Sequence, residues 1–407
     1  MVKPLISIYG GYEKEIHEHS NLNIYTEDGK IHIEKVSTNQ SLKSIDEIDK
    51  LHREITNRIS GYYRDKPLKL DNLLKRGIYE SVLNQRIIID LDSKTIKTTY
   101  NGEIPIFIRL DDDTLKLYDY RCFNSHYLYP NKKYHLHRDT LKMSSYRYPS
   151  LNYKLDINAS AKLLIEGLDY ILTEILENIR NKRIYLSFSG GIDSSLLLKL
   201  LVEKGYDIRV ITIGVKESTD LKEAEKIAYS LGFRGDHITL EVKDIEEAYS
   251  YVVNKLNIEN RILKAVGISE YHTFRYARGE ALILGQGADE LFGGYDKYRR
   301  RYDDFEWENR LDLIFLGITT TYVEWMLSKD MEVKTFYPYL NMLNWIISQS
   351  IPIELKVRGE DDIYRKWVIR EALKILKAPK EIYMRRKKAM QYSTGLSKII
   401  KKYESKS

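Results

Sequence analysis

The chain has only one cysteine, Cys122, among its 407 residues. A single thiol excludes an internal disulfide and any metal site that needs paired cysteines. No apolar run approaches the roughly 20 residues that a helix needs to cross a bilayer. The first residues, "MVKPLISIYGGYEKEIHEHS", hold too short an apolar stretch for a secretory signal. We therefore expect a cytoplasmic protein that does not span a membrane.

The composition is typical of a soluble globular protein. A hydrophobic content of 43% and a charged content of 30% allow the chain to bury substantial hydrophobic cores. A chain of 407 residues is too long for one ordinary core, which suggests two domains. The net charge of +6 is uneven, because the segment from Tyr364 to the end contains 14 Lys or Arg and 3 acidic residues. Such a basic end suits the phosphates of a nucleotide, the phosphates of nucleic acid, or solvent alone.

The chain divides into two regions with different patterns. Residues 1–150 are β-rich, with short strands and turns in "RIIIDLDSKTIKTTYNGEIPIFIRLDDDTLKLYDY". From residue 155 to 407, helical patterns alternate with short apolar strands at 183–188, 208–214, 237–241 and 281–285, and the pattern after Tyr295 is mainly helical. This alternation predicts an α/β domain, a parallel sheet with helices on both faces followed by C-terminal helices.

A polar loop lies between the first predicted strand of this sheet and the helix after it, in "LSFSGGIDSSLLLKLL". Ligands of such sheets bind at the carboxyl ends of the strands. The glycines let backbone N–H groups approach an anion, the serine hydroxyls can donate, and the helix adds the positive end of its dipole. No Gly-Lys-Ser/Thr follows, so the loop is not a Walker A motif. We predict a polyphosphate cradle in which Asp193 requires a Mg²⁺ between itself and the phosphates.

A second polar loop follows the strand at 281–285, in "LGQGADELFGGY". If both strands belong to one sheet, Asp193 and Asp289 project into the same cleft. Two carboxylates from separate loops form a suitable Mg²⁺ clamp for a polyphosphate.

Together these motifs resemble the asparagine synthetase family of PP-loop ATPases, which release pyrophosphate. "SGGxDS" alone occurs in several PP-loop enzymes, whereas "GADELFGGY" narrows the choice, and "YRKWVIREAL" and "RRKKAMQYSTG" follow in the family's order. The resemblance implies a PP-loop fold, similar to the adenine nucleotide alpha hydrolases, for 155–407. It also implies a chemistry in which a carboxylate attacks the α-phosphorus of ATP and an amine then displaces AMP to form an amide.

The resemblance also assigns roles to residues. Asp193 and Asp289 match the Mg²⁺ ligands, and Lys366 matches a lysine that supports adenylation and amide formation. Arg386 and Lys388 match basic residues of a segment that closes near the phosphates. The residues that match nucleotide contacts are Ser187, Ser189, Gly190, Gly191, Asp193, Ser194, Ile213 and Gly285.

The N-terminal region departs from the family. Glutamine-dependent members begin with Met-Cys, but residue 2 is Val2, and Cys122 lies too far inside the chain to replace an N-terminal thiol. The family's Arg-Asp pair before a glycine reads Tyr100-Asn101-Gly102 here. We therefore expect residues 1–150 to be a degenerate glutamine amidotransferase domain, similar to the Ntn hydrolases, that cannot release ammonia from glutamine.

Departures in the second region leave the ATP half of the site intact and the other substrates open. Gln286 stands where the family often has a carboxylate, Phe336 where it has an arginine, and Asn341 where it has an aspartate. Aspartate with free ammonia is the most economical substrate pair, and another acid with another amine, as in β-lactam synthetases and lasso-peptide cyclases, is the alternative.

Two further alternatives remain, a tRNA-binding PP-loop protein and a non-catalytic ATP sensor. The chain has no recognisable RNA-binding module, so a nucleic acid partner is not expected. The sequence leaves the formation of a homo-oligomer open.

Overall fold

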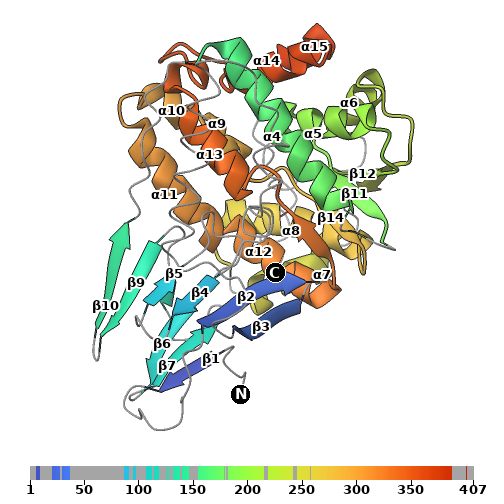
Figure 1. The fold of residues 1–407 in the computed structure, drawn as a ribbon. Helices are drawn as coiled ribbons and strands as arrows, with labels where there is room; N and C mark the ends of the chain where they lie inside the picture. Colours follow the sequence, from blue (N-terminus) through green and yellow to red (C-terminus); the bar gives the residue numbers. More distant parts are fainter. Residues whose placement is uncertain are drawn as a thin grey trace. The chain divides into compact units, whose positions relative to one another are not determined.

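The computed structural model of the chain falls into two compact units, which are considered separately (Figure 1). One unit comprises Met1–Asn152 and Leu313–Trp325, and the other comprises Tyr153–Asp312 and Met326–Ser407. None of the described helices is long and apolar enough to cross a membrane. The structure describes residues 6–9, 21–27, 30–36, 87–90, 95–97, 107–111, 114–118, 126–127, 132–137, 140–145, 155–177, 179, 182–214, 219–241, 245–256, 258–386 and 400.

Strands make up the described part of residues 1–152. They form a four-stranded sheet in the order β1-β7-β6-β8 and a six-stranded sheet in the order β10-β9-β5-β4-β2-β3, and the pairings described in both are antiparallel. The β-rich character expected from the sequence is thus present. The strands are β1 (Ile6–Tyr9), β2 (Asn21–Glu27), β3 (Lys30–Val36), β4 (Ile87–Asp90), β5 (Thr95–Lys97), β6 (Phe107–Asp111), β7 (Thr114–Tyr118), β8 (His126–Tyr127), β9 (Lys132–His137) and β10 (Thr140–Ser145).

The second unit contains a five-stranded sheet in the order β13-β12-β11-β14-β15, and its pairings are all parallel. Leu186 in the central strand pairs with Val210 on one side and with Ile283 on the other, and these three side chains are fully buried. The predicted parallel α/β sheet is confirmed. Its strands are β11 (Ile184–Ser187), β12 (Arg209–Gly214), β13 (His237–Glu241), β14 (Ala281–Ile283) and β15 (Lys334–Phe336).

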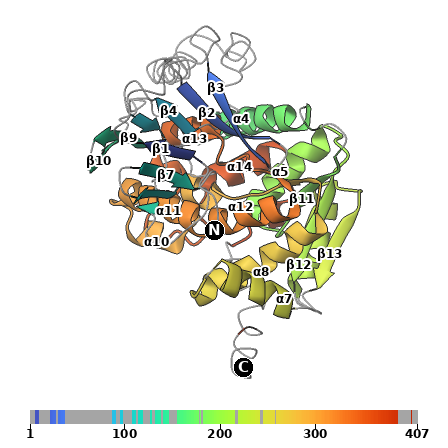
Figure 2. The ribbon, with the colours of Figure 1, turned by 90° about the horizontal axis from the view of Figure 1, so that it is seen from below.

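Helices connect the strands and cover the sheet. Right-handed crossovers place α5 and α6 on one face, and the reversed step from β13 to β14 places α7 and α8 on the other; Figure 2 shows α5 and α8 on opposite sides of β11 and β12. These helices are α4 (Ile157–Glu177), α5 (Ile192–Glu203), α6 (Thr219–Ser230), α7 (Ile245–Ser250), a π-helical turn (Tyr251–Lys255) and α8 (Arg261–Tyr276).

The chain after β14 is mainly helical, as expected, but it also supplies the edge strand β15. Three half-buried residues are too few for a periodic pattern, so the sequence did not predict this strand. Helix α14 packs against both α4 and α5. The elements are α9 (Ala288–Phe292), α10 (Asp296–Arg300), α11 (Phe305–Ile318), α12 (Thr320–Met331), α13 (Met342–Ser350), a 3₁₀ turn (Ile353–Leu355), α14 (Trp367–Ile375) and α15 (Lys380–Tyr383).

Candidate functional site

The strand order creates a switch point at the centre of the sheet. The chain leaves β11 toward β12 on one side, whereas β14 pairs with the other side of β11. Ligands of open α/β sheets bind outside the carboxyl ends of the two strands where such connections diverge. Both polar loops singled out in the sequence follow these two strands, so both lie at this switch point.

The loop after β11 is shaped by its glycines. Gly190 has φ +66°, and a Cβ there would lie 3.2 Å from the Cα of Ala224 in α6, so both the conformation and the close approach favour glycine. Gly191 precedes the first residue of α5 in an extended conformation. The Ser194 hydroxyl donates to the Gly191 carbonyl at 3.2 Å, and the Ser189 hydroxyl accepts from the Gly191 N–H at 3.3 Å. Ser189 is exposed, so its side chain is accessible to a ligand.

The two aspartates converge on one lysine. The Lys366 Nζ lies 2.7 Å from Oδ1 of Asp193, in the first turn of α5, and 2.6 Å from Oδ1 of Asp289, in the first turn of α9. The lysine side chain is fully buried, whereas the aspartate side chains are 15% and 26% exposed. Three charged groups from distant parts of the sequence therefore form a compact cluster with a net charge of −1.

Gly294 completes the packing around this cluster. A Cβ at this position would lie 1.7 Å from Oδ1 of Asp289 and 2.3 Å from Cε of Lys366. The space beside the ion pair is thus filled to contact by the backbone of the "GADELFGGY" loop. No side chain fits there without displacing the lysine or the aspartate.

The loop that carries Lys366 has an unusual backbone. Arg365 and Lys366 have φ values of +54° and +53°, and each such residue costs about 1–2 kcal/mol. Asp362 holds the loop, because its carboxylate accepts from the N–H groups of Arg358, Tyr364 and Arg365 and from the indole of Trp367, at distances of 2.8–3.0 Å. Burial alone would raise the pKa of Asp362, but these donors lower it below its usual value.

Arg370, on the second turn of α14, ties the lysine loop to the C-terminal segment. Its guanidinium is 2% exposed and donates to the carbonyls of Tyr364 and Arg365 on one side and of Tyr383 and Arg385 on the other. Burial lowers its pKa to about 10, yet it stays charged near neutral pH. This residue thereby fixes two segments that each bring a cation to the site.

A buried carboxyl group lies next to Asp289. Glu290 is 2% exposed, and the Tyr295 hydroxyl donates to its Oε1 at 2.6 Å. Burial, followed by repulsion from Asp289, raises the pKa of Glu290 to about 7. The same burial raises the pKa of Tyr295 well above its usual value. Glu290 and Tyr295 therefore brace the "GADE" turn from within the protein.

A basic residue that the sequence reasoning missed contacts the Ser-Gly loop after β11. Arg385 donates to the Gly190 carbonyl at 3.2 Å and to Oε2 of Glu223 at 2.7 Å. Its neighbour Arg386, which the family resemblance selected, is exposed. The run "RRKK" gives the motif no unique register, so the sequence carried no signal that separated the two arginines.

We expect Arg385→Met to raise the KM for ATP by about tenfold, because the loop loses a charged hydrogen bond and the phosphates lose a nearby cation. Steady-state kinetics at varied ATP concentration measure the effect. Arg386→Met is the matched control, and we expect it to change the KM by less than about twofold. A larger rise in the KM for ATP in Arg386→Met than in Arg385→Met would instead assign the contact with the phosphates to Arg386.

The other predicted nucleotide contacts lie along the carboxyl edge of the sheet. Ser187 is the last residue of β11, Ile213 lies near the end of β12, and Gly285 follows β14 by two residues; the three are half-buried. Their placement is compatible with the predicted roles, which remain predictions. Some predictions concern residues outside the described part of the chain, namely Lys388, Val2, Cys122 and Tyr100-Asn101-Gly102.

The departures from the family pattern fall near the same edge. The Phe336 carbonyl accepts from the N–H of Leu284, so the end of β15 lies beside the start of the second polar loop. Asn341 caps α13, with its side chain accepting from the N–H of Leu343 at 2.9 Å. The hydroxyl of the fully buried Tyr339 donates to the carbonyl of Asp193 at 2.9 Å. The segment around β15 is therefore built into the site's framework.

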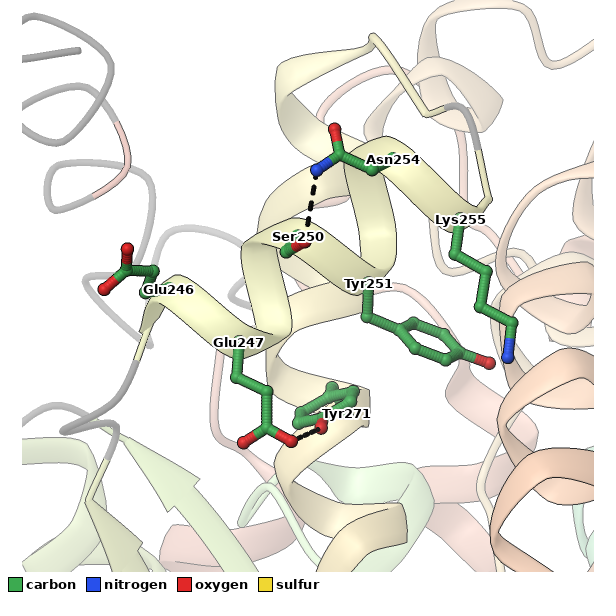
Figure 3. A pocket seen from close by; sticks show the side chains of 7 residues that line it. All are labelled: Glu246, Glu247, Ser250, Tyr251, Asn254, Lys255 and Tyr271. Atoms are coloured by element: carbon green, nitrogen blue, oxygen red, sulfur yellow. Dashed lines mark hydrogen bonds between the residues drawn. The ribbon is translucent and has the colours of Figure 1, made fainter.

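A separate open pocket of about 750 Å³ lies on α7, the π-helical turn and α8 (Figure 3). Most of its polar groups bind one another or nearby side chains: Tyr271 donates to Glu247 at 2.6 Å, and Tyr251 and Lys255 both bind Asp330. None of the sequence-predicted site residues lines it. We therefore place the candidate site at the ends of β11 and β14 instead.

The donor set at those strand ends fits Mg²⁺. Asp193 and Asp289 already hold one cation, the Lys366 ammonium, between two carboxylate oxygens. Within the described residues no group of three His, Cys, Asp or Glu side chains could enclose a metal ion. Mg²⁺ typically takes one or two protein carboxylates and completes its shell with substrate phosphates and water. Two carboxylates beside a loop that we predict to bind phosphates match that pattern.

The fold is an α/β domain in which both polar loops lie at the switch point of a parallel sheet. Residues 181–349 match the family described as Asparagine synthase. This match confirms the resemblance of the motifs to the asparagine synthetase family.

Several relatives are named glutamine-hydrolyzing asparagine synthetase. That of Gallus gallus is 24% identical over 290 residues, covering 66% of this chain and 51% of its own length. A protein of Methanocaldococcus jannaschii with the same family designation is 28% identical over 298 residues, covering 62% of this chain and 54% of its own length. The chain thus spans about half the length of these curated relatives.

Solved structures give only a weak likeness. NMN synthetase from Francisella tularensis has a TM-score of 0.32 at 13% identity, covering 61% of this chain and 87% of that one. NH3-dependent NAD synthetase from Campylobacter jejuni has a TM-score of 0.25 at 16% identity, covering 35% and 61%. Similarity at this level does not bear on the function.

Proposed function

We propose that the chain is an ATP-dependent amide ligase that forms AMP and pyrophosphate. The observation that carries this proposal is the cluster of Asp193, Asp289 and Lys366 beside the Ser-Gly loop at the ends of β11 and β14. Two carboxylates and a buried ammonium next to a phosphate-binding loop suit the cleavage of a polyphosphate. We expect the enzyme to work in the cytoplasm.

The reaction has two steps. A carboxylate oxygen of the acid attacks the α-phosphorus of ATP, and the bond to the β-phosphate oxygen breaks, which yields an acyl-adenylate and pyrophosphate. An amine nitrogen then attacks the acyl carbon, the bond to AMP breaks, and the nitrogen loses a proton. In the first step negative charge builds on the leaving pyrophosphate, so groups that stabilise this charge lower the barrier most.

The chain's residues divide this work by position. The backbone N–H groups of Ser189–Gly191 and the Ser194 hydroxyl bind the pyrophosphate portion, with the N-terminus of α5 adding its dipole. Mg²⁺, held by Asp193 and Asp289, would supply charge for the leaving pyrophosphate. Lys366 and Arg385 bring further positive charge to the same edge of the sheet.

The residues around β15 and the second loop do not define which acid and which amine the enzyme uses. Gln286 can donate and accept hydrogen bonds but cannot take up a proton near neutral pH, so the amine has to arrive unprotonated. Phe336 ends β15 beside the second loop and offers an aromatic ring instead of a guanidinium. Aspartate with ammonia is the first substrate pair to test, and an acid with an apolar side chain is the second.

The test is a screen of amino acids and amines for ATP-dependent release of AMP, with mass spectrometry of the product. We expect one acid and one amine together to give AMP, pyrophosphate and an amide in equal amounts. Binding of ATP without any turnover would favour the ATP sensor, and a salt-sensitive affinity for RNA would favour the tRNA-binding protein.

Glutamine should not replace ammonia as the nitrogen donor. The reason is Val2, because the family resemblance assigns a nucleophilic cysteine to this position and valine offers no nucleophile. The measurement compares AMP formation with purified glutamine and with ammonium at equal concentration, and glutamate release is followed in parallel. Glutamate release in step with AMP would show that residues 1–150 retain glutaminase activity.

A further inference from the structure

Lys366 occupies the position between the two proposed metal ligands. Its ammonium lies 2.7 Å from one carboxylate oxygen and 2.6 Å from the other, which are distances of tight ion pairs. No part of the side chain is exposed. A cation thus already lies against the same two carboxylates that we propose as Mg²⁺ ligands, on one oxygen of each.

The protein builds this position into its backbone. The left-handed conformations of Arg365 and Lys366 direct the lysine toward the ends of β11 and β14, and Asp362 and Arg370 hold that loop from both sides. Gly294 packs closely against the lysine on the side of the second loop, because even a Cβ there would lie 2.3 Å from its Cε. The backbone of the loop, the two ion pairs and the contact with Gly294 together hold the ammonium in place.

Charge decides what this arrangement does to metal binding. Two carboxylates brought together at a partly buried site repel each other, and the lysine offsets that repulsion. Addition of Mg²⁺ alone would place a divalent cation beside a buried ammonium and raise the net charge of the cluster from −1 to +1. A triphosphate that arrives with the metal supplies enough negative charge for both cations.

We infer that Lys366 is a positioning residue that holds Asp193 and Asp289 together in the nucleotide-free protein and excludes free Mg²⁺ until ATP binds. This inference rests on the proposed function only in its assignment of the two aspartates as metal ligands. It makes binding of the metal dependent on binding of the nucleotide, so the protein does not trap the metal alone.

The experiment measures binding of Mn²⁺ alone by electron paramagnetic resonance, and of Mg²⁺ alone by its effect on the Tm. Five proteins are compared: wild type, Lys366→Met, Asp289→Asn, the double variant Lys366→Met/Asp289→Asn, and Lys374→Met. Lys374 is a matched control, since it lies on α14 and forms an exposed ion pair with Glu371. Neither measurement depends on catalysis.

Without nucleotide, we expect the wild type and Lys374→Met to bind Mn²⁺ too weakly to detect and to show no Tm shift with millimolar Mg²⁺. Lys366→Met should bind Mn²⁺ at least about tenfold more tightly than the wild type, and Mg²⁺ should raise its Tm by several degrees. The double variant should lose both effects, which would locate the metal at the aspartate pair.

Two results would overturn the inference. One is saturable Mn²⁺ binding to the nucleotide-free wild type that Asp289→Asn removes. The other is a Lys366→Met protein that gains no metal binding, either because it folds without binding the metal or because it stays unfolded even in Mg²⁺. A Lys366→Met protein that folds only when Mg²⁺ is present would support the inference. AMP formation by a wild type that fails this test would leave the proposed function standing. If Lys366→Met gains metal binding but the wild type forms no AMP with any substrate pair, the proposed function is rejected and the inference about Lys366 stands.

Discussion

Asp289→Asn should lower kcat/KM for ATP by at least about a hundredfold, and Asp193→Asn should do the same. Each change removes one of the two carboxylates that we propose as Mg²⁺ ligands for the leaving pyrophosphate. The fold should persist, because Lys366 keeps its ion pair with the remaining aspartate. The rate of AMP release gives the activity, and circular dichroism with a thermal scan gives the stability.

The matched control is Asp330→Asn. Asp330 also forms an ion pair with a lysine, Lys255, but it lies on α12 and contacts Lys255 and Tyr251 of the separate pocket. We expect this variant to retain wild-type kinetics. The double variant Asp193→Asn/Asp289→Asn should be little worse than either single variant, since the two residues act as one unit. Wild-type rates in either single variant would remove the metal-clamp assignment.

Gly294→Ala should reduce kcat/KM for ATP by about a hundredfold, although it adds one methyl group in the loop. The methyl carbon would lie 1.7 Å from Oδ1 of Asp289 and 2.3 Å from Cε of Lys366, so one of the two side chains has to leave its position. The φ of Gly294 is outside the left-handed range, and the effect is therefore steric. Kinetics and the Tm, measured on the same preparation, separate a displaced site from an unfolded protein.

Gly359→Ala controls for the loss of a glycine in general. A Cβ at Gly359 meets no atom within 4 Å, although its φ of +99° disfavours alanine. This variant should lose some stability and keep its kcat/KM. If Gly294→Ala also kept its kcat/KM, the close packing around Lys366 would not be needed for catalysis.

The sequence predicted the sheet and the two loops because both depend on local patterns. Short apolar strands alternate with helical periods, and the polar loops follow the strands at 184–187 and 281–283 directly. The two loops lie side by side because β11 pairs in parallel with β14. The sequence did not establish this pairing, so the convergence of the loops was predicted only on the assumption that both strands belong to one sheet. The edge strand β15 has three residues and was not predicted.

The electrostatic core of the site could not be predicted from spacing. Lys366 reaches the aspartates only because α14 packs on α4 and α5 and because two residues before that helix adopt left-handed conformations. Arg370 lies within a helical pattern, where nothing in the sequence signals that its guanidinium binds four carbonyl groups. Family resemblance pointed to Lys366 as functional but not to its place between the carboxylates.

The most direct test of the central claim is phosphorus NMR of ATP during turnover by the wild-type protein with a mixture of amino acids and ammonium. The proposal predicts that AMP and pyrophosphate accumulate together and that Asp289→Asn produces neither. Formation of ADP and inorganic phosphate instead would contradict the proposal, because the bond between the α- and β-phosphates would have remained intact.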